Sequence, residues 1–181
     1  MKKLVVILAL VPIFGFSQSI FDKFADMNDV ASVTINSSMI RLAGSLAALD
    51  DDDQDAQDFK DIAHSLNGIK VFITQNEDVS QDMGATVKKY LRSSSMEELM
   101  RVKDKDANIK FYIKSGSDED HVSELLMFVS GIKDNDIGIN GRKFESVLVS
   151  LTGDIDLNKI GSLTKKMDLP HELNRAGKKG D

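Results

Sequence analysis

Hydrophobic residues recur along this chain of 181 residues at two different spacings. In some segments they return every three to four residues, which is typical of a helix with one apolar face. Ser37 or Ser38 is expected to cap the second of these helices, Gly68 to end the third, and Pro170 to follow the last. The helical segments are expected at 20–27, 39–49, 59–66, 79–91 and 157–167.

In other segments hydrophobic and polar residues alternate, which is typical of a half-buried strand. Ile109, Phe111 and Ile113, for example, alternate with lysines and a tyrosine. The Asn140-Gly141 pair suits the positive φ angles of a turn before the last strand. Strands are expected at 30–36, 69–74, 97–103, 108–114, 121–129 and 144–152.

The order of these elements predicts an α+β fold. The last four strands follow one another without a helix between them, which favours an antiparallel meander. We therefore expect a mostly antiparallel sheet that includes this C-terminal four-strand meander. The amphipathic helices are expected to pack on one face of the sheet.

The first seventeen residues have the pattern of a secretory signal peptide. Lys2 and Lys3 precede an apolar run at 4–14, and small residues stand at Gly15 and Ser17. The apolar run is shorter than the ~20 residues that a membrane-spanning helix needs. We expect cleavage after Ser17, a single α+β domain at 18–170 and a mobile tail at 171–181. The protein is then exported, and is periplasmic or secreted in soluble form.

Charge and cysteine content narrow the list of partners and cofactors. Without Lys2 and Lys3 the formal net charge of −6 becomes −8, and an acidic protein repels the phosphates of nucleic acids. The chain has no cysteine, so a disulfide, a thiolate nucleophile and a zinc-thiolate site are excluded. The position after the expected cleavage site is Gln18, whereas a lipoprotein needs cysteine there. We expect no nucleic acid partner, no membrane span and no lipid anchor.

Four sequence strings together resemble one known family, and they are Val30–Met39, Met96–Lys103, His121–Met127 and Val149–Leu157. They are structural strings, and the similarity covers nearly all of the expected mature chain. Together they are similar to the exported domain-of-unknown-function family 4252 (DUF4252) of flavobacterial-type bacteria. The resemblance implies an exported single-domain α+β protein and assigns no activity, ligand or catalytic residue.

An acidic run and three histidines are candidates for metal binding, and neither fits a known site. The run Asp50–Asp55 resembles a calcium loop, but Ala56 and Ile62 stand where an EF-hand needs glycine and a bidentate glutamate. The interpretation that we favour is a solvated acidic loop, with weak cation binding as the alternative. The histidines lack the local spacing of metal ligands, and they are His64, His121 and His171.

Motifs for covalent or nucleotide chemistry are absent from the sequence. It contains no Gly-x-Ser-x-Gly elbow and no glycine-rich phosphate loop. We therefore expect no cofactor and identify no catalytic residue.

A basic and apolar set of residues on the meander is the candidate interaction surface. Its basic members could contact an acidic partner, or could protect a sheet edge from aggregation. Its apolar members would form an exposed patch if helices cover only one face. Alternatively, the N-terminal helix folds over them. The six residues are Leu99, Arg101, Lys103, Leu126, Phe128 and Leu148.

These observations favour a non-enzymatic binding or interaction module of the cell envelope. Its partner would be another envelope protein or a second copy of itself. One alternative is a secreted hydrolase with an unrecognised carboxylate site, which would combine two buried carboxylates of raised pKa in one pocket. Another is a carrier of a small apolar ligand, which would have a cavity lined by Phe and Met.

We predict that the exported protein begins at Gln18, because the first seventeen residues are removed. Mass spectrometry of the intact protein, purified from a bacterial host that exports it, measures this directly. A mass that includes residues before Gln18 would contradict the prediction.

Overall fold

The computed structural model describes residues 19–48, 54–103, 107–132 and 144–159. Within these residues the chain forms three α-helices, six strands and two short 3-10 helices. The expected signal peptide, the acidic run at 50–53, the 140–141 turn, the C-terminal helix beyond residue 159 and the tail lie outside them. The elements are η1 (Asp22–Phe24), β1 (Val30–Asn36), α1 (Ser37–Ala47), α2 (Gln54–Ser65), β2 (Leu66–Thr74), α3 (Glu77–Ser93), β3 (Glu97–Lys103), β4 (Asn108–Ser115), β5 (His121–Ser130), β6 (Ser146–Asp156) and η2 (Leu157–Lys159).

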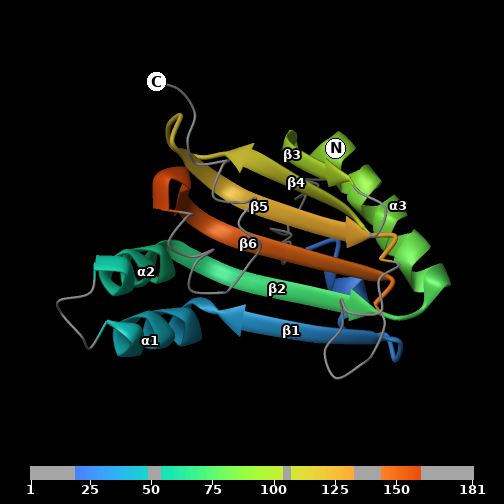
Figure 1. Cartoon of the computed structure of the whole chain (residues 1–181), viewed down its shortest axis with the longest axis horizontal. Coiled ribbons are helices and arrows are strands. Elements are labelled where there is room, and N and C mark those ends of the chain that lie inside the picture. Colours follow the sequence, from blue (N-terminus) through green and yellow to red (C-terminus); the bar gives the residue numbers. More distant parts are fainter. Residues whose placement is uncertain (1–18, 49–53, 104–106, 133–143, 160–181) are drawn as a thin grey trace, which may run out of the picture.

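The six strands form one antiparallel sheet in the order β1-β2-β6-β5-β4-β3 (Figure 1). Strands β3 to β6 are neighbours in chain order, so the predicted meander is confirmed. β2 pairs with the free side of β6 and carries β1 at the outer edge. The α+β class and the packing of helices against an antiparallel sheet are also confirmed.

The helices lie on both faces of the sheet, and the prediction of a single covered face was wrong. Leu125 belongs to a core beneath α1 and α2, whereas its neighbour Leu126 belongs to a core beneath η1 and α3. Successive residues of a strand point to opposite faces, so these two cores lie on opposite sides of the sheet. Strands that are apolar on both faces require cover on both. Figure 1 shows α1 and α2 at one end of the sheet and α3 at the other.

The predicted helix at 20–27 is a single 3-10 turn, η1, whose two aromatic side chains complete the second core. Phe21 and Phe24 are both fully buried, and Phe24 packs against Phe72 of β2. Lys23 forms an ion pair of 2.7 Å with Asp82 of α3. This short segment therefore closes the α3 side of the sheet even though it is not an α-helix.

Two junctions differ in detail from the sequence prediction. The N-cap of α1 is Asn36, whose side chain accepts a hydrogen bond of 3.0 Å from the backbone N–H of Met39, so neither serine is the cap. α2 ends at Ser65, and Gly68 lies inside β2 instead of ending the helix. Gly153 of β6 faces this junction with a φ of 155°, and a Cβ there would lie 2.4 Å from the carbonyl oxygen of Ser65.

Two glycines in helices are predicted to respond in opposite ways to alanine. A Cβ at Gly44 of α1 would lie 2.5 Å from Cβ of Ala63 in α2, whereas a Cβ at Gly84 of α3 would lie 3.7 Å from Phe128. Gly84→Ala should raise the free energy of unfolding by about 1 kcal/mol through helix propensity. Gly44→Ala should lower it by roughly 1 kcal/mol, because the overlap costs more than the propensity gains.

Urea denaturation of both variants measures these changes. Adding Ala63→Gly to Gly44→Ala should restore part of the lost stability, because it removes the atom that overlaps. Stabilisation by Gly44→Ala alone would contradict the close packing of α1 on α2.

Candidate functional site

Three of the six residues of the candidate interaction surface lie in the core. Leu126 and Leu148 have no exposed surface and Phe128 is 8% exposed, because η1 and α3 cover them. Their predicted role in an interaction surface was therefore wrong. The alternative was that the N-terminal helix folds over them, and the structure has a single 3-10 turn, η1, packed there together with α3.

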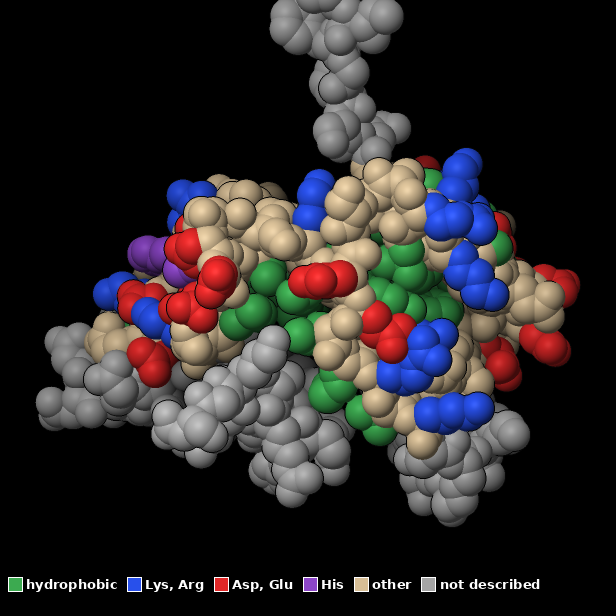
Figure 2. Space-filling view, turned by 90° about the horizontal axis from the view of Figure 1, so that it is seen from above, with side chains coloured by type: hydrophobic (Ala, Val, Ile, Leu, Met, Phe, Trp, Pro, Cys, Tyr) green, Lys and Arg blue, Asp and Glu red, His purple; other side chains and the backbone are tan. Residues whose placement is uncertain are grey.

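The other three residues of that set are exposed on β3. Leu99 is 39% exposed at an irregularity of the β3–β4 ladder, and Arg101 forms an ion pair of 2.7 Å with Glu98. Figure 2 views the molecule from this edge of the sheet and shows hydrophobic side chains between acidic and basic ones. A contact of Leu99, Arg101 and Lys103 with a partner stays a prediction.

The candidate metal ligands do not gather among the described residues. His64 is exposed on α2, and Nδ1 of His121 lies 2.8 Å from Oδ1 of Asp118 in an exposed pair. The hydrogen bond that the His121 ring donates to the Asp118 carboxylate raises the pKa of His121. No group of three or more possible ligands lies together in the described part of the chain. His171 and most of Asp50–Asp55 are outside it.

The most distinctive feature of the α3 side of the sheet is a change from apolar to polar residues along the strands. The pairing register places residues of neighbouring strands in rows across this face. One row contains Phe72, Leu148 and Phe128, and η1 and α3 cover it. Four residues further along β2, β6 and β5, the row is polar and consists of Asn36, Gly68, Thr152, Glu124 and Lys114.

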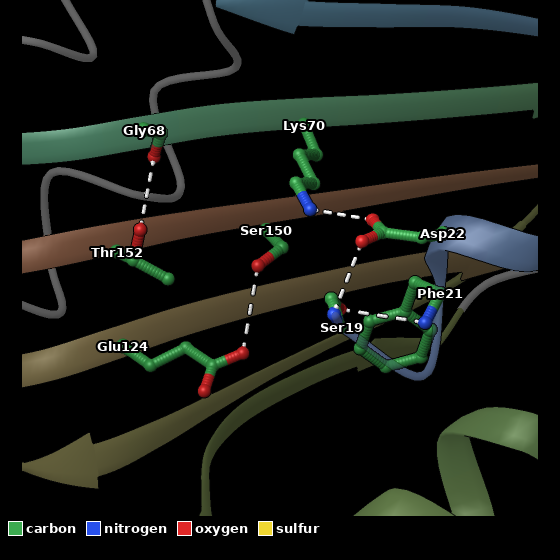
Figure 3. Close-up of polar contacts among 8 residues, drawn as sticks. All are labelled: Ser19, Phe21, Asp22, Gly68, Lys70, Glu124, Ser150 and Thr152. Carbon is green, nitrogen blue, oxygen red and sulfur yellow. Dashed lines mark hydrogen bonds and ion pairs between the residues drawn. The ribbon is translucent and has the colours of Figure 1, made fainter. Parts of the chain in front are cut away.

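A cleft of about 780 Å³ lies over the polar end of this face. Strands β1, β2, β4, β5 and β6 all contribute to it, and the end of α3 and residues 19–20 border it. Figure 3 shows the side chains of Lys70, Ser150, Thr152 and Glu124 on neighbouring strands of its floor. Hydroxyl and amide groups dominate the lining, and they include Thr34, Asn36, Asn67, Ser93 and Thr152.

Glu124 of β5 is the buried carboxylate of this cleft. The residue is 8% exposed, and its Oε2 accepts a hydrogen bond of 2.5 Å from the hydroxyl of Tyr90 in α3. Ser150 of β6 donates a longer hydrogen bond of 3.4 Å to Oε1. Both donors are neutral, and Glu124 forms no ion pair with any described residue. A buried charge without a partner of opposite sign is costly, which is why such groups are candidates for function.

Tyr90 connects α3 to the sheet at the edge of the cleft. Its ring packs edge-on against Phe21 with centroids 5.1 Å apart. Burial, together with the hydrogen bond to the Glu124 carboxylate, raises the pKa of the phenol well above its ordinary value of 10.0. The phenol is therefore a firmly protonated donor to Glu124 at neutral pH.

An ion pair fixes the N-terminal segment at one wall of the cleft. Nζ of Lys70 lies 2.5 Å from Oδ1 of Asp22, and Oδ2 of Asp22 accepts a hydrogen bond of 3.1 Å from the backbone N–H of Ser19. Figure 3 shows this chain of contacts from β2 to η1. The positive charge of Lys70 is thus neutralised within the protein. Lys114 of β4 also lines the cleft, is exposed, and forms no ion pair with a described residue.

Glu124 is not among the residues predicted to form a site, although the sequence carries a signal for it. The residue is the one carboxylate within 122–130, a strand that is otherwise mostly apolar. A charged residue inside such a strand is unusual, because charges are rarely buried without a partner. Tyr90 and Ser150 carry no comparable signal, since only the fold brings them to Glu124.

The edge strand β1 and helix α1 expose a second apolar surface, which we call the β1 edge surface. β1 pairs with β2, and no described residue pairs with its other side. Its seven residues include no charge, and uncharged edge strands are prone to pair with another strand. The large hydrophobic residues of this surface are more than half exposed, and they are Val33, Met39, Leu42 and Leu46.

The fold and the cleft together define a small α+β protein with one six-stranded antiparallel sheet and a polar pocket on one face. The model of the family described as "Domain of unknown function (DUF4252)" matches residues 23–163, and the chain belongs to this family. The resemblance in the sequence is confirmed at that level. No curated protein and no solved structure matches the chain. Among the described residues, no helix has the length and apolar character needed to cross a membrane.

We predict that neither tyrosine of the folded protein ionises at its ordinary pKa. The chain has two, and burial is the first cause that raises the pKa of each, Tyr90 and Tyr112. An unfolded chain loses these protons near pH 10, whereas the folded protein retains them, so stability falls as the pH rises above 10. Below pH 10 this contribution to stability is fully present.

Ultraviolet absorbance of tyrosinate during an alkaline titration measures the ionisation. Tyr90→Phe should remove the later-ionising group, and Tyr112→Phe serves as the matched control for the other tyrosine. Ionisation of Tyr90 in the folded protein near pH 10 would contradict its burial against Glu124.

Proposed function

We propose that this protein is an exported, non-enzymatic binding module of the cell envelope that holds a small polar ligand in the cleft over Glu124. The observation that carries the proposal is the cleft of about 780 Å³, whose floor contains a buried carboxylate that forms no ion pair with any residue in the described part of the chain. This volume lies within the roughly 300–1,000 Å³ of small-molecule sites. The export component rests on the signal-like pattern of residues 1–17.

The cleft favours binding of a polar ligand over the two alternative functions, a carboxylate hydrolase and a carrier of a small apolar ligand. A carboxylate hydrolase would combine two buried carboxylates, and Glu124 is the one carboxylate among the buried described residues. A carrier of an apolar ligand would have Phe and Met around its cavity. The described lining has no Phe or Met, and most of its side chains are polar.

We predict that small polar compounds bind in this cleft. Uniformly labelled mature protein would be screened by amide NMR against neutral sugars, amino acids, short peptides and dicarboxylic acids. Binding should shift the amide signals of Gly68, Glu124 and Thr152, which form the floor.

A blocking variant makes the screen specific for the cleft. Thr34 lies on the exposed edge strand and lines the cleft, so Thr34→Trp should abolish the shifts. Ala31 is an exposed residue on the opposite face of the same strand, and Ala31→Trp should leave binding unchanged. Shifts that persist in Thr34→Trp would contradict a site in the cleft.

The same preparation tests the rival interaction function. Analytical ultracentrifugation would show whether the protein dimerises through the β1 edge surface. If no compound perturbs the cleft, and Val33→Lys converts a dimer to a monomer, self-association replaces ligand binding as the function. Binding of an envelope protein to this surface is the other form of that rival function.

A further inference from the structure

The charged side chains that line the cleft indicate which chemical class of ligand would bind there, and this inference rests on the proposed function. Among the residues that the structure describes, three charged side chains line the cleft: Lys70, Lys114 and Glu124. Asp22 neutralises Lys70. One negative and one positive group therefore remain without an ion pair among the described residues.

Glu124 provides the binding position for a cation. A carboxylate has about four acceptor positions, and the hydroxyls of Tyr90 and Ser150 each use one. The remaining positions can accept hydrogen bonds from a group in the cleft. An ammonium group supplies both the donors and the opposite charge, which neutral hydroxyls cannot do. The buried carboxylate therefore favours a ligand with an ammonium group.

Lys114 provides the binding position for an anion beside it. Lys114 and Glu124 are directly opposite each other in the β4–β5 ladder, so both side chains leave the same face of the sheet. The Cβ atoms of such a pair lie about 5 Å apart. A ligand with several positive charges would be repelled by Lys114, whereas a ligand with a carboxylate near its ammonium group would match both residues.

We propose that the cleft binds a small zwitterion of the amino acid or dipeptide type, with its ammonium group on Glu124 and its carboxylate on Lys114. The neutral hydroxyl and amide groups of the lining, such as Thr34, Asn67 and Thr152, surround the rest of the ligand. The volume of about 780 Å³ leaves space for a side chain or a second residue.

The test uses ligands that lose one charge at a time. Alanine and alanyl-alanine would be titrated in free form, as the N-acetyl derivative and as the carboxamide, with binding followed by the amide signals of the cleft floor. The free forms should bind most tightly. N-acetylation should weaken binding by about tenfold or more, because it removes the charge that pairs with Glu124. The carboxamide should lose less affinity than the N-acetyl derivative, because Lys114 is exposed and an exposed ion pair contributes little.

Protein variants assign each charge to its residue. Glu124→Gln keeps the size of the side chain and an acceptor for Tyr90. It should weaken binding of the free ligand and leave binding of the N-acetyl derivative unchanged. Lys114→Gln should weaken binding of the free ligand and leave binding of the carboxamide unchanged. Glu97→Gln, an exposed change of the same charge on β3, is the control and should bind like the unmodified protein.

The outcomes separate this inference from the proposed function. The zwitterion proposal would be overturned if free and N-acetylated probes bind with equal affinity. It would also be overturned if Glu124→Gln leaves the affinity for the free probes unchanged. If neutral sugars or dicarboxylic acids shift the cleft signals and the charged probes do not, the zwitterion is wrong and the proposed function stands. If no compound shifts them, both are wrong. Because Lys114 lies on the surface, Lys114→Gln keeps the test valid should Glu124→Gln disturb the packing of α3.

Discussion

The pairing of β2 with β6 is the contact on which the rest of the structure depends. The chain consists of an N-terminal half, with β1, α1, α2, β2 and α3, and a C-terminal meander of four strands. Eight paired positions between Leu66–Thr74 and Ser146–Gly153 join the two halves into one sheet. Because successive side chains of each strand face opposite sides, this one pairing also builds the floor of both cores.

The same pairing produces the cleft, and it places a stabilising apolar region and a buried carboxylate on the same face of the sheet. The register aligns Phe72 with Leu148 in the covered region, and Gly68 with Thr152 at the polar end. η1 and α3 cover the apolar end, whose burial stabilises the fold. At the other end Glu124 is buried, and its hydrogen bonds from described residues come from the neutral hydroxyls of Tyr90 and Ser150, which is unfavourable for a charge. A residue that costs stability at the floor of a cleft is typical of a functional site.

The segment that follows the expected cleavage site is part of the core and of the cleft. Phe21 and Phe24 have no exposed surface, and Asp22 lies between them with its carboxylate against Lys70. Lys23 reaches α3 through Asp82. The four residues Phe21–Phe24 thus contact β2 with one side chain and α3 with another, and close the core with the two aromatic rings. Its geometry sets one wall of the cleft.

Hydrophobic spacing in the sequence determined the class of the fold and the positions of most elements. β1 and β3 have the predicted bounds, and β4 and β5 differ by one residue, because alternation is a local property of a strand. The 3-10 turn at η1 and the position of Gly68 inside β2 were not predicted from spacing, since both segments pack into the sheet through contacts with residues far away in the chain. Only the tertiary structure decided that helices cover both faces, that Leu126, Phe128 and Leu148 are buried, and that Glu124 meets Tyr90 and Ser150. The spacing of hydrophobic residues indicates that a strand has an apolar face. Which element covers that face depends on contacts between residues far apart in the chain.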